Sequence, residues 1–174
     1  MARLVELLEY LDVIGFVILA LVAWGQWRRQ RGRPAMWVTL TFGVLAVVAL
    51  IGLVTPEEPD GVFWGIVQRL TLSALALFPY FLYRFMASFG ASSRTLDRLA
   101  LIATVVVAIW SLLIPRIPEP GDPRSTAFSI FLVAFLVQWV GLLLVVAAKL
   151  WRAGRDQVTV ARRRMRLLSM GSMA

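Results

Sequence analysis

The fold of this chain is decided by residues 61–85, GVFWGIVQRLTLSALALFPYFLYRF. The stretch is long and apolar enough to cross a bilayer, for which about 20 residues are needed. Among the apolar stretches of the chain, it alone carries a charged residue well inside its span. Arg69 lies about eight residues from one end, roughly 12 Å deep at the rise of a helix. An arginine at mid-membrane costs about 2.5 to 3.5 kcal/mol, so we expect Arg69 to have a partner or a function.

The composition indicates a membrane protein. Of the 174 residues, 60% are hydrophobic and 16% are charged, and the mean hydropathy is +0.79. A soluble domain of this size cannot bury so much apolar surface in one core, so we expect the lipid bilayer as a partner. The formal net charge is +8, but the arginines fall in short clusters without interleaved aromatic residues. We therefore do not expect nucleic acid as a partner.

Cysteine and histidine are both absent from the sequence. Their absence excludes disulfides, thiolate chemistry, imidazole metal ligation and a phosphoaccepting histidine within these residues. The sequence also has no paired intramembrane carboxylates, no glycine-rich phosphate loop, no HExxH motif and no serine with an adjacent base. We expect no cofactor, no metal and no enzymatic activity here, and an output enzyme domain would lie downstream of Ala174.

The pattern of apolar runs and helix breakers predicts an all-α, polytopic membrane helical bundle that forms one domain. Five spanning helices are predicted, at residues 7–27, 35–54, 62–85, 96–114 and 125–151. Pro34 suits the first turn of the second helix, and TPEEPDG at 55–61 favours a tight turn. The prolines of PRIPEPGDPR at 115–124 exclude a helix there. Ser93 or Thr95 is expected to cap the fourth helix.

Basic residues predict the orientation of the bundle. One set of loops and helix ends holds most of the eighteen basic residues: Arg28, Arg29, Arg31, Arg33, Arg84, Arg94, Arg98, Lys149, Arg152, Arg155, Arg162, Arg163, Arg164 and Arg166. By the positive-inside rule these segments are cytoplasmic, so the N-terminus, the 55–61 turn and the 115–124 loop face outward. The expected location is a bacterial cytoplasmic (inner) membrane, which the chain crosses several times.

The last residues of the chain allow two interpretations. Residues 152–164 form a polar, basic connection, and the sequence turns apolar again from Met165. Residues 165–174 could form an interfacial amphipathic tail whose arginines contact anionic headgroups. We favour the second interpretation, in which Arg162 to Arg166 flank the cytoplasmic start of a sixth spanning helix that is truncated here.

A small set of polar residues within the apolar runs forms the candidate site. Gln68 and Arg69 lie in the predicted outer half of the third helix, at the depth of Asp12 in the first. An ion pair between Asp12 and Arg69 is therefore compatible in depth, although for Asp12 we favour the alternative of an interfacial acid near the helix start. The pair would be a structural clamp, or Arg69 would receive an anionic or polar ligand in a cavity open to the outside.

Two further residues complete the predicted site. Gln138 lies near the middle of the fifth helix, where a single glutamine more often bonds across to a neighbouring helix than binds a ligand. Pro79 lies toward the cytoplasmic end of the third helix and removes one backbone donor, so we expect a kink there. An event in the outer half could then move the inner end of this helix about Pro79.

Four stretches of the chain resemble a known type of protein: LFPYFLYRFMASF (Leu77–Phe89), TLDRLAL (Thr95–Leu101), PEPGDPR (Pro118–Arg124) and VARRRMRLLSMG (Val160–Gly171). They resemble the N-terminal multi-span region of membrane-bound signalling proteins of actinobacterial type. The resemblance implies about seven helices that precede a histidine kinase, diguanylate cyclase or serine/threonine phosphatase domain. This chain stops at Ala174, before the last two helices, so the resemblance supplies no catalytic residue.

Two functions of different classes follow from these observations. The first is a sensory input region, which detects a signal at its outer side or within the membrane and passes it to a cytoplasmic output domain. A homodimer and a small ligand on the outer side are its expected partners. The second is a small transporter or channel-like module with Asp12, Arg69 and Gln138 along one path. The absence of a convincing internal repeat disfavours the transporter.

Overall fold

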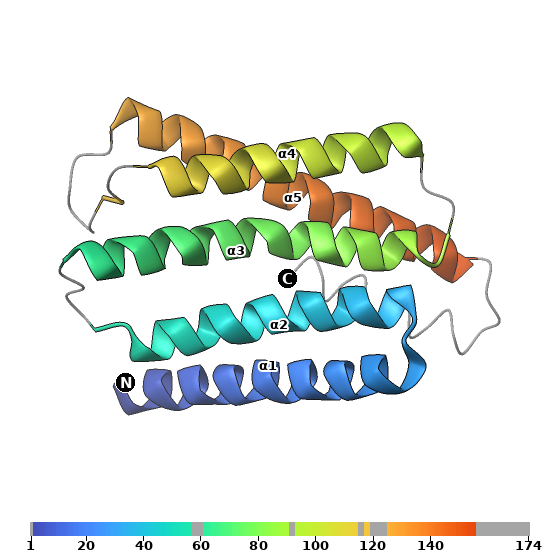
Figure 1. Cartoon of the computed structure of the whole chain (residues 1–174), viewed down its shortest axis with the longest axis horizontal. Helices are drawn as coiled ribbons and strands as arrows, with labels where there is room; N and C mark the ends of the chain where they lie inside the picture. Colours follow the sequence, from blue (N-terminus) through green and yellow to red (C-terminus); the bar gives the residue numbers. More distant parts are fainter. Residues whose placement is uncertain (1, 57–60, 91–92, 115–116, 119–124, 156–174) are drawn as a thin grey trace.

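The computed structural model describes residues 2–56, 61–90, 93–114, 117–118 and 125–155. Within this part of the chain the secondary structure is all helical (Figure 1). The helices are α1 (Ala2–Gln30), α2 (Arg33–Val54), α3 (Val62–Ala87), α4 (Arg94–Leu113) and α5 (Thr126–Arg155). All five are long and apolar enough to cross a membrane. The predicted all-α bundle is confirmed, and its helices have the length and composition of a multi-pass membrane protein.

The helix boundaries follow local sequence signals. Helix α2 starts after Gly32 and has Pro34 in its first turn, where the missing N–H of proline costs no helical bond. Gly61 precedes α3 with φ at 96°, in the left-handed region that glycine adopts without strain. Ser93 caps α4, because its Oγ accepts the Leu96 N–H at 3.2 Å. The cap is therefore Ser93, one of the two predicted candidates.

The helices extend beyond the predicted apolar spans at their arginine-rich ends. Helix α1 continues to Gln30 through Arg28 and Arg29, and α5 continues to Arg155. Arginine is a good helix former, and a positive charge in the last turn interacts favourably with the helix dipole. A span predicted from apolar residues alone therefore ends before the helix does.

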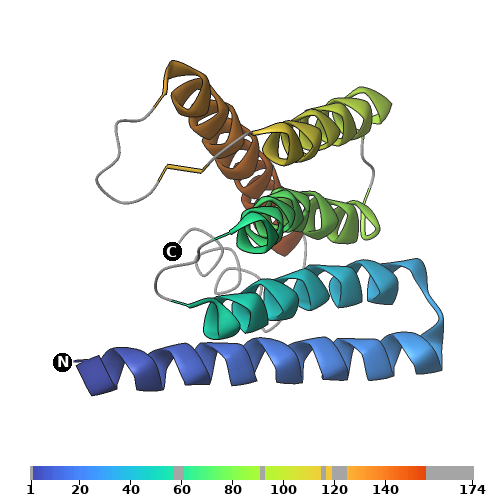
Figure 2. The ribbon, with the colours of Figure 1, turned by 60° about the vertical axis from the view of Figure 1, so that its left-hand side comes forward.

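Helix α3 lies at the centre of the arrangement (Figures 1 and 2). It contacts α2 on one side and both α4 and α5 on the other, and α4 also contacts α5. Helix α1 packs against α2 and against no other described helix. Successive helices run in opposite directions, so residues 28–33, 84–90, 93–98 and 149–152 share one end of the bundle, here called the basic end.

The buried core is formed by α3, α4 and α5. One cluster holds Ala76, Val107, Ile114, Phe131 and Phe135, and the other holds Tyr83, Met86, Ala100, Leu142 and Val146. Within the apolar window of α5, 33% of the residues are buried, against 11% in α1. The outer faces carry exposed leucine, isoleucine and valine side chains, which a bilayer would cover.

Some predictions fall on residues that the structure does not describe. The predicted sixth helix at 165–174 and the connection beyond Arg155 lie outside the described residues. The same holds for Arg162, Arg163, Arg164 and Arg166.

Candidate functional site

The buried face of α4 carries a polar residue at every seventh position. Asp97, Thr104 and Ser111 follow one another at this spacing, which places them on one face of the helix, about two turns apart. Thr104 is 1% exposed and Ser111 is completely buried. We call these three residues the polar seam. Each of them makes a polar contact at a different level of the α3–α4–α5 core.

Gln138 of α5 meets the polar seam at its middle residue. Its side-chain Nε2 donates to Thr104 Oγ1 at 3.1 Å and to the backbone carbonyl of Ala76 at 3.2 Å. The side chain is buried, and it links α5 to both α4 and α3. The neighbouring Trp139 donates its indole Nε1–H to the carbonyl of Leu75 at 3.3 Å. Gln138 thus bonds across to neighbouring helices, as is usual for a lone glutamine in a spanning helix.

One of the two carbonyls on α3, that of Leu75, is available because of Pro79. Helix α3 continues through Pro79, whose ring is fully buried. Proline has no N–H, so the carbonyl of Leu75, four residues earlier, lacks its partner within the helix. The indole of Trp139 supplies the missing donor. We call the group Leu75, Ala76, Pro79, Thr104, Gln138 and Trp139 the proline junction.

One atom of the proline junction has no partner. Gln138 Oε1 is buried and accepts no hydrogen bond from the described residues. The amide cannot be turned around, because only its nitrogen can donate to the Ala76 carbonyl. A buried acceptor without a donor costs about 1 to 3 kcal/mol. The junction is therefore less stable than a fully satisfied one, at a point where three helices meet.

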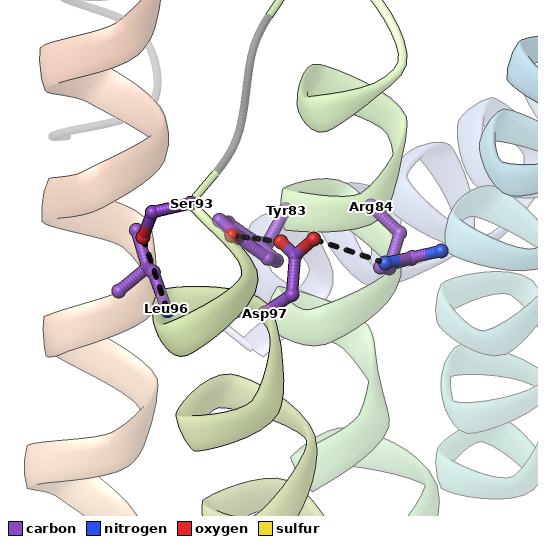
Figure 3. Close-up of polar contacts among 5 residues, drawn as sticks. All are labelled: Tyr83, Arg84, Ser93, Leu96 and Asp97. Carbon is purple, nitrogen blue, oxygen red and sulfur yellow. Dashed lines mark hydrogen bonds and ion pairs between the residues drawn. The ribbon is translucent and has the colours of Figure 1, made fainter.

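A second polar cluster lies at the basic end (Figure 3). The Tyr83 hydroxyl donates to Asp97 Oδ1 at 2.5 Å, and Arg84 Nη1 lies 3.8 Å from Asp97 Oδ2. The carboxylate thus faces two consecutive residues of α3, one through each oxygen. Asp97 is in the first turn of α4, where the helix dipole stabilises a negative charge.

Two cation–π contacts extend this cluster to α2 and α5. The guanidinium of Arg84 lies 5.3 Å from the ring centroid of Trp37 on α2. Lys149 Nζ of α5 lies 5.1 Å from the ring centroid of Tyr83, a side chain that is completely buried. Trp37, Tyr83, Arg84, Asp97 and Lys149 form the basic-end cluster. It joins α2, α3, α4 and α5, and Asp97 is also the first residue of the polar seam.

Hydroxyl groups connect α3 and α4 toward the other end of the bundle. Ser111 Oγ, the last residue of the polar seam, donates to the carbonyl of Ala108 at 2.7 Å. Ser73 Oγ of α3 donates to the same carbonyl at 3.3 Å. Direct polar contacts between α3 and α4 therefore lie at Ser73 and Tyr83, and Gln138 of α5 bridges the two helices at the level of Ala76.

The predicted ion pair between Asp12 and Arg69 is not formed. Asp12 is exposed on α1, which contacts only α2 among the described helices, whereas Arg69 is on α3. Asp12 is the third residue of the span that begins at Tyr10, which agrees with an acid near the membrane boundary. Asp12 and Arg69 have compatible depths along the membrane normal, but α2 lies between α1 and α3. Arg69 is half-buried and has an interaction partner.

The structure also bears on the predicted ligand cavity near Gln68 and Arg69. Both residues are half-buried on α3. A groove of about 250 Å³ lies nearby and is lined by Ile51, Val54, Phe63, Trp64, Val67 and Leu70. This lining is entirely apolar and contains neither Gln68 nor Arg69. The groove has space for apolar groups but offers no polar group to an anion.

Several residues of these clusters were not predicted as site residues: Trp37, Tyr83, Arg84, Asp97, Thr104, Lys149 and Trp139. The spacing of Asp97, Thr104 and Ser111 was a readable signal. A second signal was that the stretches LFPYFLYRFMASF and TLDRLAL, which carry the resemblance, flank one short connection. The structure brings Tyr83 and Arg84 of the first stretch against Asp97 of the second.

Comparison with known proteins adds no family to this description. No family model matches the chain, and neither the curated proteins nor the solved structures contain a match. The candidate site is therefore defined by its geometry, as two polar clusters that join α3 to α4 and α5.

Proposed function

We propose that this chain is the membrane-embedded sensory or input region of a bacterial signal-transduction protein. One observation carries the proposal: the proline junction and the basic-end cluster lie one turn apart on α3, at Pro79 and Tyr83. Both clusters tie α3 to α4 and α5. A change in one cluster can therefore reach the other through a single turn of helix.

Helix α5 provides the route to the end of the bundle. Gln138 and Trp139 belong to the proline junction, and Lys149, about three turns further on, contacts Tyr83 in the basic-end cluster. In the proposed orientation the basic end is cytoplasmic. A stimulus that alters the junction would displace the cytoplasmic end of α5, and with it an output domain attached beyond Ala174.

The hydrogen bonds of the proline junction are weak enough for the helices to change between two arrangements. Hydrogen bonds between helices in a membrane contribute about 0.6 kcal/mol on average and about 1.7 kcal/mol at most. The three bonds of Gln138 and Trp139 are then worth about 2 kcal/mol together. Since about 1.4 kcal/mol changes an equilibrium tenfold, a modest signal could change which arrangement is populated.

The transporter or channel-like alternative has less support. It requires Asp12, Arg69 and Gln138 to line one path. Asp12 is on α1, which contacts only α2 among the described helices. Gln138 donates both of its amide hydrogens to neighbouring helices, and the groove near Arg69 is apolar. No specific observation favours transport.

Distance measurement between spin labels tests the coupling. The chain contains no cysteine, so Ser88→Cys, directly after α3, and Arg152→Cys on α5 label two exposed positions of the basic end. In bilayers, Gln138→Leu and Pro79→Ala are expected to shift or broaden the distance distribution measured by pulsed electron paramagnetic resonance. Val137→Leu, at an exposed neighbouring position, should leave it unchanged.

Two outcomes would contradict the proposed function. Distributions that are identical in the parent chain, Gln138→Leu and Pro79→Ala would show that the junction does not control the basic end. The coding sequence downstream of Ala174 is a second test. A soluble kinase, cyclase or phosphatase domain supports sensing, whereas a stop codon together with solute flux in proteoliposomes would support the transporter.

A further inference from the structure

The basic end has a large excess of positive charge. Its described side chains include Arg28, Arg29, Arg31, Arg33, Arg84, Arg94, Arg98, Lys149 and Arg152. Among the described residues, Asp97 is the only acid at this end, and it already faces Tyr83 and Arg84. This excess attracts anionic groups, and at the end of a membrane bundle the nearest ones are lipid headgroups.

Among the arginines of this end whose side chains the structure describes, Arg84 is the one that is held within the bundle. Its side chain is 34% exposed, whereas the other arginines that surround the basic end are exposed. The Trp37 ring lies against its guanidinium, which restricts the orientation of the group. An arginine held in a fixed plane loses little conformational entropy when it binds a second group.

The hydrogen-bond donors of Arg84 are largely unused. The contact with Asp97 is an ion pair at 3.8 Å, longer than a hydrogen bond. Arg84 Nε is buried and donates to no described acceptor. A guanidinium presents its donors as a planar fork, and phosphate oxygens match this geometry.

Helix α2 places a second arginine on the same side. Trp37 contacts Tyr80 and Phe81 of α3 as well as Arg84, so its face of α2 is the one that packs on α3. Arg33 precedes Trp37 by four residues and therefore lies on this face, one turn nearer the end. Arg33 is exposed. Tryptophan is typical of the level where headgroups begin, so both arginines lie at the depth of lipid phosphates.

We infer that Arg84 and Arg33 form a binding site for the phosphate group of an anionic phospholipid at the α2–α3 interface. The acyl chains of the lipid lie along the apolar faces of α2 and α3. Arg84 contributes an oriented guanidinium, and Arg33 contributes a flexible one. The site does not depend on the proposed signalling function.

The test measures lipid selectivity of the full chain in phosphatidylcholine nanodiscs that contain a minor fraction of phosphatidylglycerol. Spin-labelled phosphatidylglycerol and spin-labelled phosphatidylcholine report the motionally restricted fraction of each lipid. Arg84→Gln and Arg33→Gln are each expected to lower the preference for phosphatidylglycerol about fivefold. The matched control Arg29→Gln removes the same charge from an exposed position of α1 and should change the preference less than twofold.

The outcomes distinguish a specific lipid-binding site from a general effect of surface charge. Equal losses in Arg84→Gln, Arg33→Gln and Arg29→Gln would overturn the inference, because net charge alone would then explain the preference. An unchanged preference in Arg84→Gln would also overturn it. If Arg84→Gln fails to fold by far-ultraviolet circular dichroism, the comparison of Arg33→Gln with Arg29→Gln decides.

A competition experiment distinguishes binding of a lipid phosphate from binding of free inorganic phosphate. Inorganic phosphate, added at constant ionic strength, is expected to leave the restricted fraction of phosphatidylglycerol unchanged. Displacement of the lipid by inorganic phosphate would show that the site binds a free anion, and the lipid assignment would be wrong.

Discussion

The bond between Trp139 and Leu75 should matter only because residue 79 is proline. In the parent chain, Trp139→Phe keeps an aromatic ring against Phe78 but removes the indole donor, so the Leu75 carbonyl loses its partner. In a Pro79→Ala background, the new N–H at position 79 can donate to the same carbonyl. The indole bond then becomes redundant. The two substitutions are therefore expected to be coupled.

The expected size of this coupling follows from the energies of buried hydrogen bonds. An unpartnered buried carbonyl costs about 1 to 3 kcal/mol, and bonds between membrane helices reach about 1.7 kcal/mol. We therefore expect the double mutant to be about 1 kcal/mol more stable than the sum of the single effects predicts. The loss of ring area in Trp139→Phe is the same in both backgrounds and cancels in the cycle.

Reversible unfolding in mixed detergent micelles measures the four free energies of unfolding. The control is Trp110→Phe, because Trp110 packs edge-to-face against Phe131 and its indole makes no hydrogen bond with the described residues. Trp110→Phe and Pro79→Ala should be additive within about 0.5 kcal/mol. If Trp139→Phe and Pro79→Ala are additive within the same margin, the proposed role of Pro79 in exposing the Leu75 carbonyl is refuted.

Three further predictions concern the same core. Gln138→Leu should be at least about 2 kcal/mol more stable than Gln138→Ala, because both remove the unpartnered Oε1 but only leucine fills the volume of the buried side chain; the opposite order of unfolding midpoints would contradict this. Tyr83→Phe should cost about 1 to 2 kcal/mol by removing the donor to Asp97, and the loss should shrink in an Asp97→Asn background. Ser93→Ala should lower the free energy of unfolding by about 1 kcal/mol through loss of the α4 cap. Thr95→Ala, at an exposed position of α4 whose hydroxyl makes no hydrogen bond with the described residues, is its control, and equal losses would argue against capping.

The helices were predictable from sequence because each is bounded by residues with a fixed local effect. Pro34 and Gly61 mark helix starts through their backbone preferences alone. The length of each apolar run is set by the thickness of a bilayer. The ends at arginines were less well predicted, because arginine interrupts an apolar run but not a helix.

The candidate site was less predictable, because hydropathy gives depth and not lateral neighbours. Asp12 and Arg69 have compatible depths, yet the packing order of the helices separates them. Gln138 was recognised as a residue that bonds across helices, but its partners are a backbone carbonyl and Thr104. A backbone carbonyl cannot be recognised in a sequence; only the Leu75 carbonyl, which Trp139 contacts, is indicated, by the proline four residues later.

The arrangement of polar residues on α4 limits how this helix can move. If α4 slid by one turn, Ala100 or Ala108 would replace Thr104 opposite Gln138, and the glutamine amide would lose its side-chain partner. A slide of two turns would bring another polar residue into place, but this requires about 10.5 Å of translation. Piston motion along the membrane normal is therefore disfavoured at both distances. A small tilt of α5 that leaves Gln138 opposite Thr104 keeps the register of the two helices and requires no such translation.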